Sequence, residues 1–100
     1  MIRLVTPDAP FIINNDTESL LEFQLTLTSM ENKEPIPVKI EFTEGEILMV
    51  LIDELVISPG DAFYFTQPYG VLSPEEGMII SLNKEDSSPL GVWFEAWEKR

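Results

Sequence analysis

The chain has 100 residues, of which 44% are hydrophobic and 10% aromatic, enough apolar material for one domain that covers residues 1–100. It contains neither cysteine nor histidine, which excludes disulfides, zinc and copper sites of the usual kinds and nucleophiles activated by histidine. Eighteen acidic residues against six basic ones give a net charge of −12, so we expect neither nucleic acid nor an anionic membrane as a partner.

The acidic residues are spread from Asp8 to Glu98 and often alternate with apolar ones, as on the solvent side of a strand. We interpret them as a solubilising surface, the alternatives being a face matched to a basic partner or a mimic of DNA charge. Residues 1–16 hold no apolar run of secretory length, and the longest apolar run, residues 47–52, is too short to cross a bilayer. We therefore expect no signal peptide and, for a cellular protein, a cytoplasmic location.

Alternation of apolar and polar residues predicts the first strands. Short strands are expected at residues 2–5 and 11–13. Residues 21–28 (LEFQLTLT) place Phe23, Leu25 and Leu27 on one side and polar residues on the other, which predicts a half-buried strand.

Residues 38–42 (VKIEF) alternate in the same way and predict the next strand, because the preceding PIP sequence excludes a helix. Pro37, Lys39 and Glu41 are suited to the edge of a sheet, where proline and charge discourage further pairing. Such an edge could equally be completed by a partner.

Residues 47–52 (ILMVLI) follow a turn at residues 44–46. All six are apolar, so both faces of a strand there would be apolar, which predicts a strand covered on both faces or one that changes sheets. A helix over residues 46–57 is the alternative, because Leu and Met favour helices. Asp53 and Glu54 form no polar stripe, however, and Ser-Pro follows, so a strand is favoured. A break near these two acids would give a hairpin or a bent strand.

Two stretches nearly repeat each other: VISPGDAFYF at residues 56–65 and VLSPEEGMIISL at residues 71–82. We interpret both as turns between strands, since proline fits the second position of a turn and Gly60 permits a positive φ. Ser73 and Glu76 also imitate the start of a helix, but Gly77 and the β-rich sequence after it limit this to one short helical turn. Strands are expected after the turns, at residues 62–66 and 78–82.

A polar loop at residues 83–89 precedes the last strand, LGVWFEAWEK. One side of that strand carries Val92, Phe94 and Ala96, and the other carries Trp93, Glu95 and Trp97, so both faces need some cover. The total of about seven to nine short strands predicts an all-β fold, an antiparallel β-sandwich of immunoglobulin-like or jelly-roll-like type.

Candidates for catalysis are few, and we expect neither an enzyme nor a cofactor. The paired acids at residues 53–54 and 75–76 show no arrangement on two sides of a sugar cleft, and phosphate-binding motifs are absent.

The loop residues Asn14, Asn15, Asp16 and Glu18 could offer oxygen ligands to calcium. Their spacing differs from that of an EF-hand, so an ordinary Asx turn is favoured and no metal site is assigned. Asn15 also begins a glycosylation sequon, which would matter only in a secreted protein.

The aromatic side chains are the remaining candidates for function. Trp93, Trp97, Tyr64 and Tyr69 form a candidate interface, because tryptophan and tyrosine are enriched where proteins bind each other. The alternatives are a platform on which sugars stack and a core role for one of the tryptophans. The sequence leaves open which tryptophan would be the core residue.

The second half of the chain has a characteristic layout of turns and strands. A strand leads into a Pro-Gly-Asp turn, then follow an aromatic strand, a leucine, a glycine turn, an Ile-Ile strand and a closing strand that ends near a glutamate. The matching positions are Ile57, Pro59, Gly60, Asp61, Leu72, Gly77, Ile79, Ile80 and residues 92–98.

This layout resembles that of small virion proteins of tailed bacteriophages. The resemblance implies a non-catalytic structural protein of the virion, active in capsid decoration or cementing or in tail or baseplate attachment. It implies protein partners, through self-association or docking on a larger viral assembly. The alternatives from other classes are a carbohydrate-binding module that uses Trp93, Trp97 and Tyr69, and an acidic inhibitor that mimics nucleic acid.

Overall fold

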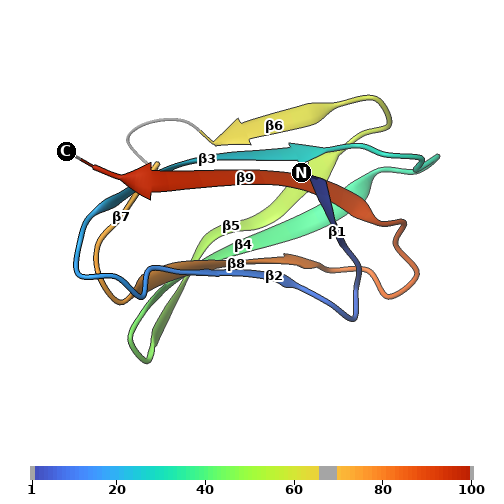
Figure 1. Ribbon diagram of the computed structural model, residues 1–100. Coiled ribbons are helices and arrows are strands. Elements are labelled where there is room, and N and C mark those ends of the chain that lie inside the picture. The colour runs from blue at the N-terminus through green and yellow to red at the C-terminus, as the bar shows by residue number, and fades with distance from the viewer. Residues whose placement is uncertain (1, 66–69, 100) are drawn as a thin grey trace.

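The computed structural model describes residues 2–65 and 70–99, and these residues form β-strands and connecting turns without a helix (Figure 1). The strands are β1 (Ile2–Val5), β2 (Phe11–Asn14), β3 (Leu21–Thr28), β4 (Ile36–Glu44), β5 (Ile47–Ile57), β6 (Ala62–Phe65), β7 (Val71–Leu72), β8 (Glu76–Leu82) and β9 (Leu90–Glu98). The predicted all-β fold is confirmed, and strand rather than helix is confirmed for β5. The two-residue β7 has no counterpart among the predicted strands.

The strands form two antiparallel sheets that pack face to face (Figure 1). The first sheet has the order β1-β9-β3-β6, with β7 also paired to β3, and the second has the order β2-β8-β4-β5. With the short β7 set aside, successive strands alternate between the sheets except for the β4–β5 hairpin, which is the double Greek-key order of a jelly roll. The structure is therefore a β-sandwich, and its connectivity is jelly-roll-like rather than immunoglobulin-like.

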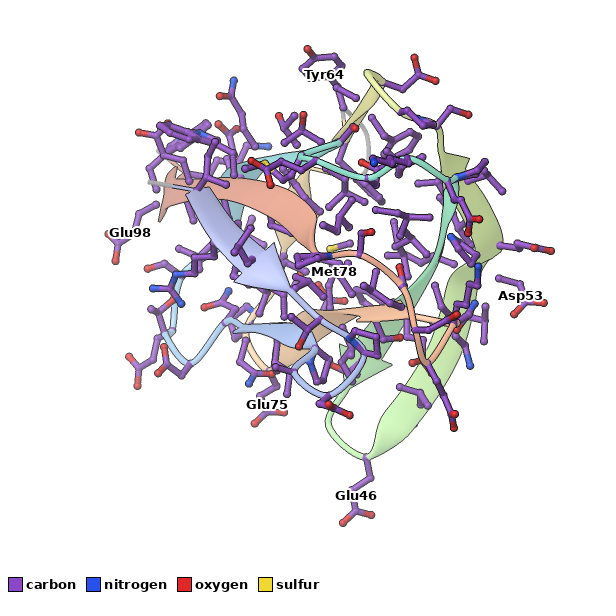
Figure 2. All side chains as sticks on the ribbon, turned by 90° about the vertical axis from the view of Figure 1, so that its right-hand side faces the viewer. Glu46, Asp53, Tyr64, Glu75, Met78 and Glu98 are labelled. Atoms are coloured by element: carbon purple, nitrogen blue, oxygen red, sulfur yellow. The ribbon has the colours of Figure 1, made fainter. Side chains whose placement is uncertain are left out.

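Alternate residues of the inner strands fill the space between the sheets. Leu25 and Leu27 of β3 face Val38 and Ile40 of β4, and all four are 0–1% exposed. Met78 of β8 lies in the middle of this core (Figure 2). Burial of each such side chain contributes about 1.5 to 3 kcal/mol to folding, so the predicted alternation is also the main source of stability.

The two similar turns have the predicted role. In the first, the Asp61 amide donates to the Ser58 carbonyl at 2.9 Å, and Gly60 has a φ of 85°. In the second, the Glu76 amide donates to the Ser73 carbonyl at 3.0 Å, and Glu75 has a φ of 71°. Both match a type II turn, which needs a positive φ at its third residue.

The second turn also keeps one bond of a helix start, because the Ser73 amide donates to the Glu76 carboxylate. No helix follows, since Gly77 already belongs to β8, which begins two residues before the predicted strand. A side chain at Gly77 would meet the Ile13 carbonyl oxygen at 2.3 Å and Thr43 Oγ1 at 2.8 Å. Glycine is required there because two strands approach its backbone closely.

The prediction that residues 47–52 are covered is wrong. β5 lies at the edge of the second sheet, and Ile47, Leu48, Met49 and Val50 are each 48–61% exposed. The reason is that β5 is the outermost strand of its sheet, next to β4 alone, and the tip of the β4–β5 hairpin points away from the first sheet (Figure 1). Figure 2 shows Glu46 at that tip, far from the core around Met78.

The assignment of Pro37, Lys39 and Glu41 to an edge strand is also wrong. They lie on β4, which runs between β8 and β5 and is therefore an interior strand of the sheet. The expected bend near the two acids of β5 is confirmed: the register shifts between Val38 and Glu41 of β4, so that β5 has extra residues between its positions 50 and 55. Such bulges bend a strand without ending it.

Candidate functional site

A row of exposed side chains crosses the outer face of the first sheet. Trp93 of β9 is opposite Ile2 of β1 and Thr26 of β3, and Thr26 is opposite Tyr64 of β6. Directly opposite residues of paired strands point to the same face, so these four side chains share it. Trp93 is 41% exposed, Ile2 48% and Tyr64 66%. Figure 2 shows Tyr64 pointing away from the sandwich.

Trp97 lies on the same face, four residues further along β9. Its Nε1 donates to the Glu22 carboxylate at 2.9 Å, and it is opposite Glu22 on β3. The side chain is 41% exposed. The hydrogen bond holds the indole against the sheet while leaving part of the ring accessible.

Polar groups separate the two tryptophans. Glu95 lies between them on β9 and is opposite Gln24 of β3, and both side chains are exposed. Four residues of extended strand place the two Cα atoms about 13 Å apart. The face therefore presents two aromatic rings with a carboxylate and an amide between them, and we call Ile2, Tyr64, Trp93 and Trp97 the aromatic face.

The structure brings together three of the four residues of the candidate interface. Trp93, Trp97 and Tyr64 share one face, whereas Tyr69 lies outside the described residues. Neither tryptophan is a core residue, because the inner side of β9 is occupied by Leu90, Val92 and the half-buried Phe94. The sequence interpretation missed Ile2, which joins this face because β1 pairs with β9. Ile2 stands next to the charged residue Arg3, and nothing in the local sequence marks Ile2 as part of an interface.

The Asn15 loop is a structural turn. The Asn15 side chain is 2% exposed, and its Nδ2 donates to the carbonyls of Ser19 and Leu72, both at 2.9 Å. Its Oδ1 accepts from the amide and hydroxyl of Thr17, which confirms the predicted Asx turn. Burial also keeps this side chain of the sequon from reacting in the folded protein.

Within residues 2–65 and 70–99, His, Cys, Asp and Glu side chains form no group of three or more that could hold a metal ion. A hollow of about 290 Å³ opens between the sheets beside β1 and β2. Arg3 lies there, 5.8 Å above the ring of Phe11, and the other lining residues are apolar apart from Asn14. This hollow has no carboxylate or second titratable group that could transfer a proton, so it does not resemble an active site.

Acidic side chains project from several sides of the molecule. Glu46, Asp53, Glu75 and Glu98 point away from the body in different directions (Figure 2). These four carboxylates lie on no common ridge, which is compatible with a solubilising surface.

One lysine makes the clearest charge contacts. The Nζ of Lys84 lies 3.1 Å from the Glu34 carboxylate and 3.9 Å from that of Asp86. The hydrogen bond to Glu34 and the charge of Asp86 raise the pKa of Lys84 above its usual value. The Lys84 side chain is exposed, so its contacts link two surface loops without forming a site.

Comparison with protein families, with curated proteins and with solved structures finds no match to this chain. The described residues contain no helix long and apolar enough to cross a membrane.

Proposed function

We propose that this chain is a non-catalytic structural protein that acts through protein–protein contacts, as a component of a tailed-phage virion in capsid decoration or in tail or baseplate attachment. The observation that carries the proposal is the aromatic face, where both tryptophans and Tyr64 are exposed together. The outer faces of β-sandwiches normally carry polar residues. Three aromatic side chains on one such face are typical of the anchor residues of an interface.

The fold is compatible with this role. Jelly rolls built from two Greek keys are frequent in viral capsid proteins, but the same architecture serves lectins and cupins. Fold alone does not imply function, so the proposal depends on the aromatic face and on the resemblance of the second half of the chain to phage virion proteins.

The test uses the two tryptophans as reporters, because the chain contains two and both lie on the aromatic face. We expect light scattering across a concentration series to show self-association, accompanied by a blue shift of tryptophan emission as the rings leave water. Trp97→Ala should weaken this association by about 2 kcal/mol, roughly 30-fold in Kd, without loss of the folded circular dichroism spectrum. Ile12→Ala, at an exposed position of the second sheet, is the matched control.

Unchanged tryptophan emission and an unchanged mass for Trp97→Ala would contradict self-association through the aromatic face. If Trp97→Ala unfolds instead, the indole stabilises the first sheet rather than an interface.

Carbohydrate binding is the second candidate, and the polar groups between the rings favour it. Glu95 and Gln24 could bond sugar hydroxyls while Trp93 and Trp97 stack on sugar rings. Titration with soluble oligosaccharides would then change tryptophan emission in the dilute protein, and Gln24→Ala would weaken that change. An acidic mimic of nucleic acid has less support, because the labelled acids in Figure 2 point in several directions.

A further inference from the structure

β5 exposes a strand edge whose first half is unprotected among the described residues. It is the outermost strand of the second sheet and has 11 residues, whereas β1, β2 and β6, which also end sheets, have four each. A long edge with free backbone groups is normally blunted by charge, proline or a bulge, because it can pair with another chain. Only part of β5 has such protection.

The protection is confined to the second half of the strand. The register shifts lie between positions 50 and 55, where Asp53 and Glu54 also project into solvent. The first half pairs regularly with β4 from Ile47 to Val50 and has no charge, proline or glycine. Residues 47–51, which we call the apolar edge, are thus the part of β5 that is open to pairing.

We propose that the apolar edge pairs antiparallel with the same edge of a second copy of this chain, joining two second sheets across a two-fold axis. This surface is separate from the aromatic face, and the inference does not depend on the function proposed for that face. A two-fold interface needs a surface that complements itself. An uncharged apolar strand segment meets this requirement when it runs antiparallel to its own copy.

The exposed area fits a weak, reversible contact. The five side chains of the apolar edge are 39–61% exposed, on both faces of the strand. Together they present on the order of 500 Å² per chain, so a pair of copies would bury at most roughly 1,000 Å², the size of a weak, transient interface. The backbone hydrogen bonds of the new strand pair further stabilise the dimer. We therefore expect a reversible dimer with a Kd on the order of 10 μM.

Charge and the length of the apolar edge together select the register. A two-fold axis perpendicular to the sheet must place one residue opposite its own copy, because paired residues share a face. With Val50 at the axis, Glu46 would lie opposite Glu54 of the second copy, and the two carboxylates would repel each other. With Met49 at the axis, Glu46 lies opposite Ile52 and Leu48 opposite Val50. Met49 is also the middle residue of the apolar edge, so this register alone pairs all five residues of the edge with one another, and the proposed register has Met49 opposite Met49.

The absence of cysteine makes this register directly testable. Opposite Cα atoms of an antiparallel pair lie about 4.5 to 5.5 Å apart, within the range that a disulfide spans. Under mild oxidation we expect Met49→Cys to form a covalent dimer at least about 10 times faster than Val50→Cys or Ile12→Cys. Val50→Cys reports the rival register, and Ile12→Cys, on an exposed site of β2, reports random collision. Equal rates for the three variants, or a faster Val50→Cys, would overturn the proposal.

Solution mass supplies the second measurement. The wild-type protein should change from monomer to dimer over a series from about 1 to 500 μM, and Met49→Lys should raise the Kd more than about 10-fold. Added salt should lower the wild-type Kd several-fold, because it screens repulsion between chains of charge −12. The inference fails if the wild type stays monomeric, or if Trp97→Ala abolishes the dimer while Met49→Lys leaves it intact. That last result would support the aromatic face alone, so the two proposals can be separated.

Discussion

Gly77→Ala should be among the most damaging single-methyl additions in this protein. Gly77 lies in β8, directly opposite Asn14 of β2 and Thr43 of β4, so its α-carbon faces two neighbouring strands. A Cβ atom there would lie 2.3 Å from the Ile13 carbonyl oxygen, about 1 Å short of an ordinary contact of 3.4 Å. The obstacle is backbone, so relief requires β2 to move away from β8.

The expected loss is about 3 kcal/mol, from roughly 2 kcal/mol for overpacking and roughly 1 kcal/mol for a weakened backbone hydrogen bond between β2 and β8. In a chain of this size, a loss of about 3 kcal/mol lowers Tm by about 12 to 24 °C. Urea and thermal unfolding followed by far-UV circular dichroism measure both quantities.

Two variants make the cause of the loss identifiable. Gly60→Ala adds a methyl group where no atom lies within 4 Å and the φ is 85°, so it should cost only the backbone strain of about 1 kcal/mol. Thr43→Ala removes a side-chain oxygen 2.8 Å from the new methyl but leaves the Ile13 carbonyl in place, so it should not rescue Gly77→Ala. Full rescue by Thr43→Ala, or a Gly77→Ala protein as stable as the wild type, would refute the argument from close strand approach.

Three further variants test other parts of the fold by urea unfolding. Glu75→Gly should raise the free energy of unfolding by about 0.5 to 1 kcal/mol, because glycine adopts the φ of 71° without strain; an equal gain from Glu75→Ala would point to charge instead. Asn15→Ala should lower it by about 2 to 3 kcal/mol, because two carbonyls and the Thr17 groups lose their partner; a change no larger than that of the exposed control Asp16→Ala would contradict this. Leu48→Lys in dilute protein should change it by less than about 0.5 kcal/mol, since that side chain is 54% exposed; a loss above about 2 kcal/mol would mean that the strand is covered.

Much of the fold follows from local features of the sequence. The period of two in β3 put Phe23, Leu25 and Leu27 inside because successive strand residues must point to opposite faces. The Ser-Pro-Gly-Asp sequence was interpretable as a turn because proline and glycine restrict or permit particular φ values whatever surrounds them. The same period placed Trp93 and Trp97 together on one face of β9, but it left open whether that face points inward or outward.

The candidate interface could be predicted only in part. Sequence spacing placed Trp93 and Trp97 on one face of a single strand, but Tyr64 joins them through Thr26 of an intervening strand. Ile2 joins through the pairing of β1 with β9. Such cross-strand neighbours depend on strand order, which the local sequence does not specify.

By itself, the sequence determined which residues alternate, where the chain turns, and that a sandwich of short strands would result. The tertiary structure alone decided what lies against each face. Residues 47–51 of β5 have the apolar side chains of a covered strand and yet are exposed, because β5 is the outermost strand of its sheet and its hairpin points away from the first sheet. β4 has the proline and charges of an edge strand and yet runs through the interior of its sheet. Alternation can be recognised within a single strand. Burial depends on which strands pack beside and against it, and only the assembled sheets supply those neighbours.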